Sequence, residues 1–226
     1  MVDNLKEIIH KSQICQRNWD LSEEIPQEHV DLIVEAATQS PTRQNIPFYN
    51  VDVVTDRSLI NSIHNNSAFF KIKPGMELSE YSHAVVRGSD VEKDEDGVIT
   101  KTNPQVLAPL LLVFSANEET YYDNQLRHGK DSTERVKWEK DVSLSIGVAS
   151  GFAKLISTQL GYVSGFCACY GEEIDKLIGS SVRLFLGIGK PDKNKKYTES
   201  HIEEFEYPSF KDVKRLKPVK VEWHNG

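Results

Sequence analysis

The side chains most often used in catalysis form no recognised pattern in this sequence. It has seven histidines, but none forms H-E-x-x-H or another ligand pair on one helix face, so a catalytic metal is not expected. Serine, histidine and aspartate are present, yet the G-x-S-x-G turn of many hydrolases is missing. The run G-I-G-K-P at 187–191 lacks the spacing of a Rossmann or Walker loop. Hydrolytic, metal and dinucleotide-fold chemistry therefore have no support.

The cysteines also lack the spacing of a known site. Cys15, Cys167 and Cys169 are odd in number, and C-A-C is tighter than the C-x-x-C of zinc ribbons and thioredoxin-like proteins. The simplest interpretation is three reduced thiols that serve as small buried residues.

Three separated segments have a more specific pattern. The first is Q-I-C-Q-R-N-W at 13–19, and the second is S-P-T-R-Q-N-I-P-F at 40–48. The third is L-G-Y-V-S-G-F-C-A at 160–168, followed by F-L-G-I-G-K-P at 185–191. In order and spacing these segments resemble the nitroreductase family of FMN enzymes over nearly the whole chain.

The resemblance implies a fold and an activity. The fold is an α+β sandwich of a mixed, mainly antiparallel sheet and packed helices, in a domain-sharing homodimer with two FMN sites at its interface. The activity is a ping-pong oxidoreductase reaction: NADH or NADPH gives a hydride to flavin N5 and leaves, and a small organic acceptor such as a nitroaromatic or quinone is then reduced. No protein side chain is expected to act as a catalytic group, because flavin N5 carries the chemistry.

The resemblance also assigns residues to the cofactor. FMN has a dianionic phosphate, a hydroxylated chain and a planar ring, which require cations, short polar side chains and backbone donors. Arg17 is expected at the phosphate or ribityl chain, and the backbone N–H groups near Ala168 and Cys169 at flavin N5 and O4. The basic cluster at 193–196 is expected to close over the phosphate. The full set is Gln13, Cys15, Arg17, Pro41, Thr42, Arg43, Gln44, Asn45, Asn103, Gln105, Ala168, Cys169, Lys195 and Lys196.

The first segment departs from the family pattern. Gln13 and Ile14 replace the usual arginine and a basic or polar residue, and Cys15 stands at the usual serine. Phosphate binding then relies on Arg17, Arg43 and the lysine cluster. Two alternatives stay open: an FMN enzyme of the same fold with other chemistry, such as reductive dehalogenation, an oxidase or a flavin-consuming reaction, and a non-catalytic binding protein that has lost the cofactor.

Composition limits the remaining classes. A chain of 226 residues fits a single domain over 1–226, and its net charge of -7 gives no footprint for nucleic acid. No stretch approaches the roughly 20 apolar residues that span a membrane. The start of the chain lacks the apolar block of a signal peptide, so a cytoplasmic location is expected.

Hydrophobic periodicity predicts the elements that position these segments. Helices are expected at the N-terminus, from Pro26 to about Ser40, after the capping residue Asp56, and at 172–179. Strands are expected at 48–56, 108–116, 162–170 and 182–190. The run 13–22 is expected to be irregular, and 67–103 an acidic excursion with its charges at 90–97. The tail from 192 to 226 is expected to lie against another surface, which in a dimer is the partner.

A long helix from about 131 to 160 is the most informative element. One apolar stripe includes Val142, Ile146 and Ala153, a second includes Leu144 and Phe152, and small residues fill the spaces between them. Such a helix is expected to be buried on every side, at the centre of a domain or of a dimer, with Gly161 as its C-cap.

Overall fold

The computed structural model describes residues 2–13, 15–16, 19–67, 69–72, 83–84, 99–101, 103–122, 134–192 and 221–223. The helices are α1 (Val2–Lys11), α2 (Gln27–Thr38), α3 (Arg57–Asn66), α5 (Glu134–Gln159) and α6 (Glu172–Ile178), with short 3-10 turns at η1 (Arg43–Asn45) and η3 (Pro104–Leu107). The strands are β1 (Trp19–Asp20), β2 (Tyr49–Val54), β3 (Phe69–Ile72), β4 (His83–Ala84), β5 (Ile99–Lys101), β6 (Leu110–Ala116), β7 (Val163–Cys167) and β8 (Val182–Pro191).

A five-stranded sheet forms the centre of the molecule. Strand β8 pairs with β6 on one side and with β7 and β1 on the other, and β2 lies beyond β6. Every pairing in this sheet is antiparallel. All seven residues of β6 are buried, which is the behaviour expected of a continuously apolar central strand.

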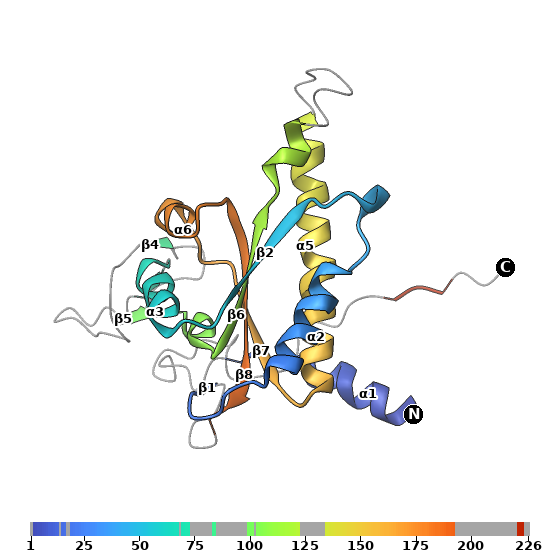
Figure 1. The fold of residues 1–226 in the computed structure, drawn as a ribbon, viewed down its shortest axis with the longest axis vertical. Coiled ribbons are helices and arrows are strands. Elements are labelled where there is room, and N and C mark those ends of the chain that lie inside the picture. The colour runs from blue at the N-terminus through green and yellow to red at the C-terminus, as the bar shows by residue number, and fades with distance from the viewer. Residues whose placement is uncertain are drawn as a thin grey trace.

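Helices cover both faces of this sheet. On one face α2 and α5 pack against Leu112, Phe114 and Leu186. On the other, α3, α6 and η3 pack against residues that alternate with these along the same strands, such as Val113 and Phe185. Figure 1 shows the two helical layers on opposite sides of the sheet. The expected α+β sandwich is confirmed, in a three-layer form.

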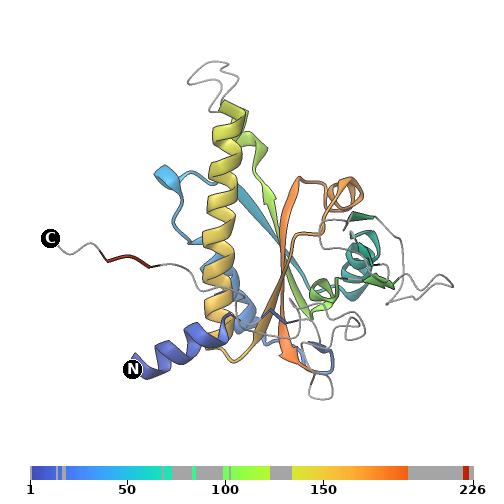
Figure 2. The ribbon, with the colours of Figure 1, turned by 180° about the vertical axis from the view of Figure 1, so that it is seen from behind.

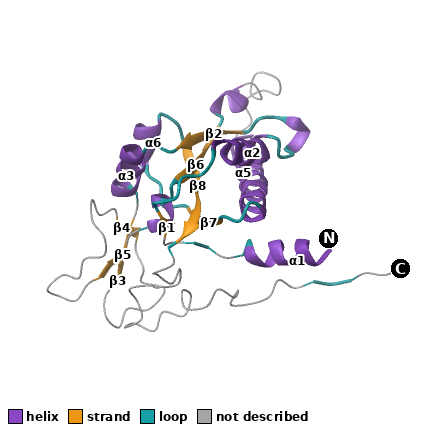
Figure 3. Ribbon diagram, turned by 60° about the horizontal axis from the view of Figure 1, so that its bottom comes forward, coloured by secondary structure: helices purple, strands orange, loops and turns teal. Residues whose placement is uncertain are grey.

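A second, three-stranded sheet is formed by β3, β4 and β5 in the order β4-β3-β5. It lies on the same side of the main sheet as α3 and α6 (Figure 3). The sequence predicted an excursion without periodicity over 67–103, and these short strands are the part of it that the structure describes. The acidic residues at 90–97 lie outside the described residues.

Local sequence explains where several elements begin and end. Pro26 precedes α2, and the Asp56 carboxylate accepts a hydrogen bond from the Leu59 backbone N–H at 2.8 Å, so the predicted cap of α3 is confirmed. Gly161 and Gly179 follow α5 and α6 with φ of 82° and 79°, a region that favours glycine. The run 13–22 is less irregular than predicted, because the buried Trp19 anchors β1 by an indole N–H bond to the Pro104 carbonyl at 2.8 Å.

Helix α5 differs from its prediction in burial. The stripe of Val142, Ile146, Ala149 and Ala153 is buried against the sheet, as expected. The second stripe is not: Leu144 is 68% exposed and Phe152 48% exposed. Figure 2 shows α5 along the outside of the fold. The prediction of burial on every side is therefore wrong within one chain, since a single sheet can cover only one side of a helix. Among the described residues, no helix is both long and apolar enough to cross a bilayer.

Candidate functional site

The first group of candidate residues surrounds β7. The segment 15–16 runs beside this strand: the Gln16 backbone N–H donates to the Ser164 carbonyl at 2.9 Å, and the Cys15 thiol donates to the Phe166 carbonyl at 3.9 Å. Gln16 is 1% exposed. The N-terminal motif and the strand that follows the long helix, which are about 150 positions apart in the sequence, therefore form one surface.

Turn η3 closes the other side of β7. Asn103 and Gln105 are buried next to it, at 4% and 6% exposure. Gln16 and Gln105 lie so close to β7 that a Cβ atom on Gly165 would overlap the Gln16 carbonyl oxygen and lie 3.1 Å from Gln105 Cγ. A Cβ atom on Gly187 would likewise overlap the Gln105 backbone carbonyl oxygen. The glycines in the third motif thus allow three chain segments to meet.

Because of this close contact, adding one methyl group at Gly165 should strongly affect the stability of the fold. We expect Gly165→Ala to lower the free energy of unfolding by about 1–3 kcal/mol, because the Gln16 backbone must move to admit a Cβ atom. Urea denaturation of the cofactor-free protein measures the effect. Gly171→Ala is the matched control, since a Cβ there has nothing within 4 Å. Equal stability of the two variants would contradict the close packing.

Lys154 brings a buried cation to this group. Its side chain leaves α5 toward β7, where Nζ donates to the Ser164 carbonyl at 3.4 Å and lies 4.7 Å from the centre of the Phe166 ring. The residue is 7% exposed. Burial lowers the pKa of Lys154, and the neighbouring Cys15 raises it in part. A buried ammonium group beside the N-terminal motif suits an anionic ligand.

The polar atoms around β7 test whether FMN fits this place. Gln105 Oε1 and Ser164 Oγ are buried and have no hydrogen-bond partner within the part of the chain that the structure describes. Buried polar groups normally find partners, so such atoms suit a ligand with hydroxyl groups. Lys154 and Ser164 lie together, since the ammonium bonds the Ser164 carbonyl, and this pair suits the phosphate or a hydroxyl group of FMN. Gln105 lies against the next residue of the strand, Gly165, and offers a further acceptor to the ribityl chain.

The other predicted residues near β7 are more exposed. Ala168 is exposed and Cys169 is partly buried, directly after the last residue of the strand. Gln13 is exposed and its amide lies 3.2 Å from His10 Nδ1. The structure brings Cys15 and Gln105 against β7, buries Asn103 directly before η3, and leaves Gln13 just after the end of α1.

The second group, Pro41–Asn45, forms an arm between α2 and β2. The Thr42 hydroxyl donates to the Ile46 carbonyl at 2.7 Å, which holds the arm in a tight turn. Gln44 and Asn45 both have a φ of 56°. Among residues other than glycine, asparagine adopts this region most readily, so Gln44 is the strained residue and marks the arm as a candidate functional segment.

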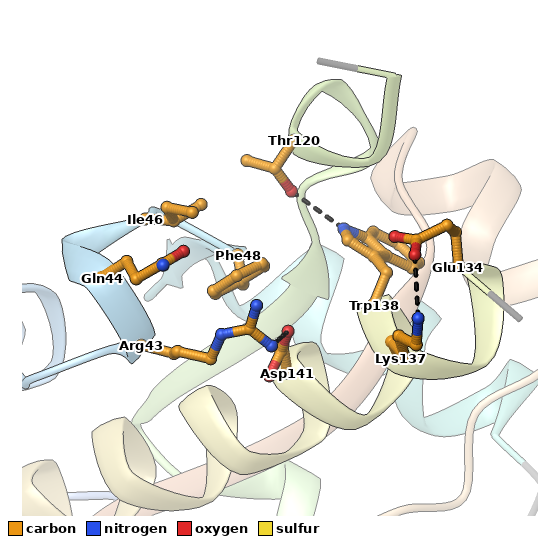
Figure 4. Close-up of a pocket in the computed structure, with 9 residues that line it drawn as sticks. All are labelled: Arg43, Gln44, Ile46, Phe48, Thr120, Glu134, Lys137, Trp138 and Asp141. Carbon is orange, nitrogen blue, oxygen red and sulfur yellow. Dashed lines mark hydrogen bonds and ion pairs between the residues drawn. The ribbon is translucent and has the colours of Figure 1, made fainter. Parts of the chain in front are cut away.

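A cavity of about 340 Å³ separates the arm from the N-terminal half of α5. Figure 4 shows the Arg43 guanidinium facing Asp141 on α5, with an ion-pair distance of 2.7 Å. The Trp138 indole N–H donates to the Thr120 hydroxyl at 2.9 Å on the far side. The two cations that line this cavity, Arg43 and Lys137, are each paired with a carboxylate, of Asp141 and Glu134, so the cavity offers no excess positive charge to a phosphate dianion.

The two groups lie far apart within one chain. The arm contacts α5 at Asp141, whereas Cys15 and β7 contact it at Lys154. These two positions are about 13 residues apart on one helix, which corresponds to about 20 Å. In Figure 1 the arm lies beside the upper half of α5, and β7 lies near its lower end. The predicted site is therefore not assembled by a single chain.

Three predicted residues, Arg17, Lys195 and Lys196, lie outside the described residues, as does Lys193. Sequence reasoning missed Lys154, although one feature pointed to it. Lys154 is the single charged residue between Asp141 and Glu172, inside the otherwise uncharged second half of the long helix.

Comparison with known proteins gives a likeness in structure alone. No protein-family model and no curated protein matches the chain. The nitroreductase NfrA1 from B. subtilis is 12% identical with a TM-score of 0.59, over 84% of this chain and 68% of that one. A nitroreductase family protein from Clostridium novyi NT is 18% identical with a TM-score of 0.56, over 86% and 90%.

A third solved structure is the NADPH:FMN oxidoreductase from Vibrio harveyi complexed with NAD+. It is 15% identical with a TM-score of 0.59, over 97% of this chain and 80% of that one. These values establish the arrangement of helices and strands. The fold that the three sequence segments predicted is thus confirmed: the chain has the nitroreductase fold.

Proposed function

We propose that this protein is a homodimeric FMN-dependent oxidoreductase that passes electrons from NADH or NADPH to a small organic acceptor, such as a nitroaromatic or a quinone. The observation that carries the proposal is the buried Lys154 ammonium at Ser164 of β7, a strand that also carries or contacts two unsatisfied polar atoms, Ser164 Oγ and Gln105 Oε1, within the nitroreductase fold. The NADPH:FMN oxidoreductase among the similar structures supports FMN as the ligand and a reduced nicotinamide as the donor.

Different residues of one chain would bind different parts of the cofactor. Lys154 offers a positive charge to the phosphate, in place of the arginine that Gln13 replaces in the N-terminal motif. Gln105 and Ser164 offer an amide oxygen and a hydroxyl to the ribityl chain. Arg17, Lys195 and Lys196 stay in the proposal as further cations.

A second copy of the chain completes the site. The exposed stripe of α5 carries Leu144, Val148, Phe152 and Leu155, and a Cβ atom on Gly147 or Gly151 between them would meet nothing within 4 Å. Apolar side chains beside small residues suit close packing against another helix. A twofold axis across this stripe sets α5 helices against each other, so that the arm Pro41–Asn45 of one copy reaches the β7 group of the other.

In this arrangement FMN supplies reversible hydride transfer at its N5 atom. The backbone N–H groups after β7, at Ala168 and Cys169, would hold the ring and would supply hydrogen bonds to the negative charge that it gains on reduction. The arm Pro41–Asn45 of the second copy would help to hold and orient the ring. No side chain of the protein has to move a proton or attack the acceptor.

The visible spectrum of the purified protein tests the proposal. We expect the protein to take up one FMN per chain, shown by equilibrium dialysis and by a change in the flavin spectrum. Addition of NADH or NADPH without oxygen should bleach the flavin band, and a nitroaromatic or quinone should restore it. A buffer sample with free FMN is the control for reduction in solution.

Other outcomes identify the alternatives. A protein that takes up no FMN would reject the proposal and favour a non-catalytic binding protein of this fold. Bound FMN that the nicotinamides reduce, but that only oxygen or a halogenated compound reoxidises, would indicate an oxidase or a reductive dehalogenase. Loss of the flavin itself during turnover would indicate a flavin-consuming enzyme.

A further inference from the structure

All three cysteines of the chain meet at the end of β7. The Cys15 thiol lies against the Phe166 carbonyl at 3.9 Å, Cys167 is the last residue of the strand, and Cys169 follows two positions later. None of the three forms a disulfide. Within the described residues, no three histidine, cysteine or acidic side chains are arranged to hold a metal ion. The chemistry to consider for this cluster is therefore that of its thiol groups.

The spacing and burial of Cys167 and Cys169 indicate that these two cysteines are the candidate partners for a disulfide. Side chains two positions apart on an extended chain point to the same side, and their Cα atoms are about 6.6 Å apart. A disulfide needs the two Cβ atoms about 3.5–4.5 Å apart, and because β7 ends at Cys167, the backbone at 168–169, which belongs to no strand, can turn to bring them together. Cys167 and Cys169 both pack against the core on the α3/α6 side of the sheet, while Ala168 between them is exposed.

The two thiols are in contact but in different surroundings. The Cys167 thiol donates a hydrogen bond to the Cys169 side chain, and this bond together with burial raises the pKa of Cys167 well above its usual range. Cys167 is 4% exposed, whereas Cys169 is only partly buried. Small molecules in solution can therefore reach Cys169 first, and Cys167 is the group behind it.

We propose that Cys167 and Cys169 form a reversible dithiol–disulfide site that reacts with low-molecular-weight disulfides. The Cys169 thiolate attacks one sulfur of the small disulfide, which forms a mixed disulfide and releases the first small thiol. Cys167 then gives its proton to solvent and attacks Cys169 Sγ, which forms the intramolecular bond and releases the second small thiol. The protein loses two electrons and two protons, and the small disulfide gains them.

This activity is independent of the proposed flavin chemistry. It needs no cofactor, so it is tested on the full-length, cofactor-free protein. The chain is well suited to the test because trypsin cuts after Lys154 and Lys176, which leaves Cys167 and Cys169 on one peptide, 155–176. Cys15 falls on another, 12–17.

The experiment treats the protein with oxidised glutathione, blocks free thiols with an alkylating agent, and measures tryptic peptides by mass spectrometry. We expect peptide 155–176 to lose two hydrogens and to take up no alkylating agent until it is reduced, while peptide 12–17 is alkylated. Two alkyl groups on 155–176 after oxidation, or a link between the two peptides, would overturn the proposal.

Single substitutions separate the roles of the two thiols. In Cys167→Ser the mixed disulfide with glutathione should accumulate on Cys169, since nothing resolves it. In Cys169→Ser the buried Cys167 should remain unmodified under the same conditions. Cys15→Ser, the matched control, should still form the bond in 155–176. Circular dichroism checks that each variant is folded. Equal glutathione uptake by Cys167→Ser and Cys169→Ser would contradict the order of attack.

Discussion

Replacing Phe152 by aspartate is expected to convert the protein from a dimer to a monomer and to abolish FMN binding with it. Phe152 lies in the middle of the exposed stripe of α5 and is 48% exposed in the single chain. A carboxylate there must be buried against an apolar helix of the second copy, which costs several kcal/mol. Because the arm Pro41–Asn45 of the second copy is then absent, half of the proposed site is lost.

Sedimentation velocity and FMN titration measure the two effects of Phe152→Asp. Folding of the monomer should change little, because the side chain replaced is already half in water. Leu177→Asp on α6 is the matched control: Leu177 is 40% exposed, but it lies on the opposite side of the sheet. A monomeric wild-type protein would reject the dimer. A Phe152→Asp monomer that binds FMN as tightly as the wild type would show that one chain holds the whole site.

The sequence predicted the helices and central strands well because each has a strong local pattern. Strand β6 is a continuous apolar run, α3 begins after a capping aspartate, and α5 carries an unbroken apolar stripe. The two-residue strand β1 was missed for the opposite reason. Its pairing depends on where Trp19 packs, and that contact, with η3, is far away in the sequence.

The candidate site was predicted in part. The motifs selected segments that the structure brings together around β7, because glycine-rich and polar runs beside a strand can be recognised in the sequence. They could not show that the arm Pro41–Asn45 and the β7 group are about 20 Å apart along α5. Nor could they reveal Lys154, whose side chain reaches β7 only when the helix has the observed rotation about its axis.

Replacing Lys154 by methionine is expected to stabilise the cofactor-free protein and to weaken FMN binding. Methionine keeps the length of the side chain and its packing against Phe166, but it removes a charge that burial disfavours. We expect the free energy of unfolding to rise by about 1–2 kcal/mol at neutral pH. Loss of a charge-assisted contact to phosphate should weaken FMN binding by about tenfold or more.

The stability gain of Lys154→Met should depend on pH in a defined direction. Burial lowers the folded-state pKa of Lys154 below its unfolded value, so the unfolded chain binds the proton more tightly. The wild-type penalty is complete below the folded-state pKa and disappears as the pH rises toward about 10.4, the ordinary lysine value. The difference between variant and wild type in urea denaturation should therefore shrink as the solution becomes alkaline.

Lys190→Met is the matched control for this substitution. Lys190 also bonds a carbonyl, that of Gly161 at 2.7 Å, and lies over an aromatic ring, that of Tyr162 at 4.5 Å. It is more exposed than Lys154, so its loss should not stabilise the protein and should leave FMN affinity unchanged. If Lys154→Met binds FMN as the wild type does, the phosphate is held by other cations and Lys154 is only a buried charge. If both variants lose FMN affinity equally, the loss comes from the lower positive charge of the protein and not from a direct contact with Lys154. A direct contact would weaken FMN binding in Lys154→Met alone, because Lys190 lies at the surface on β8.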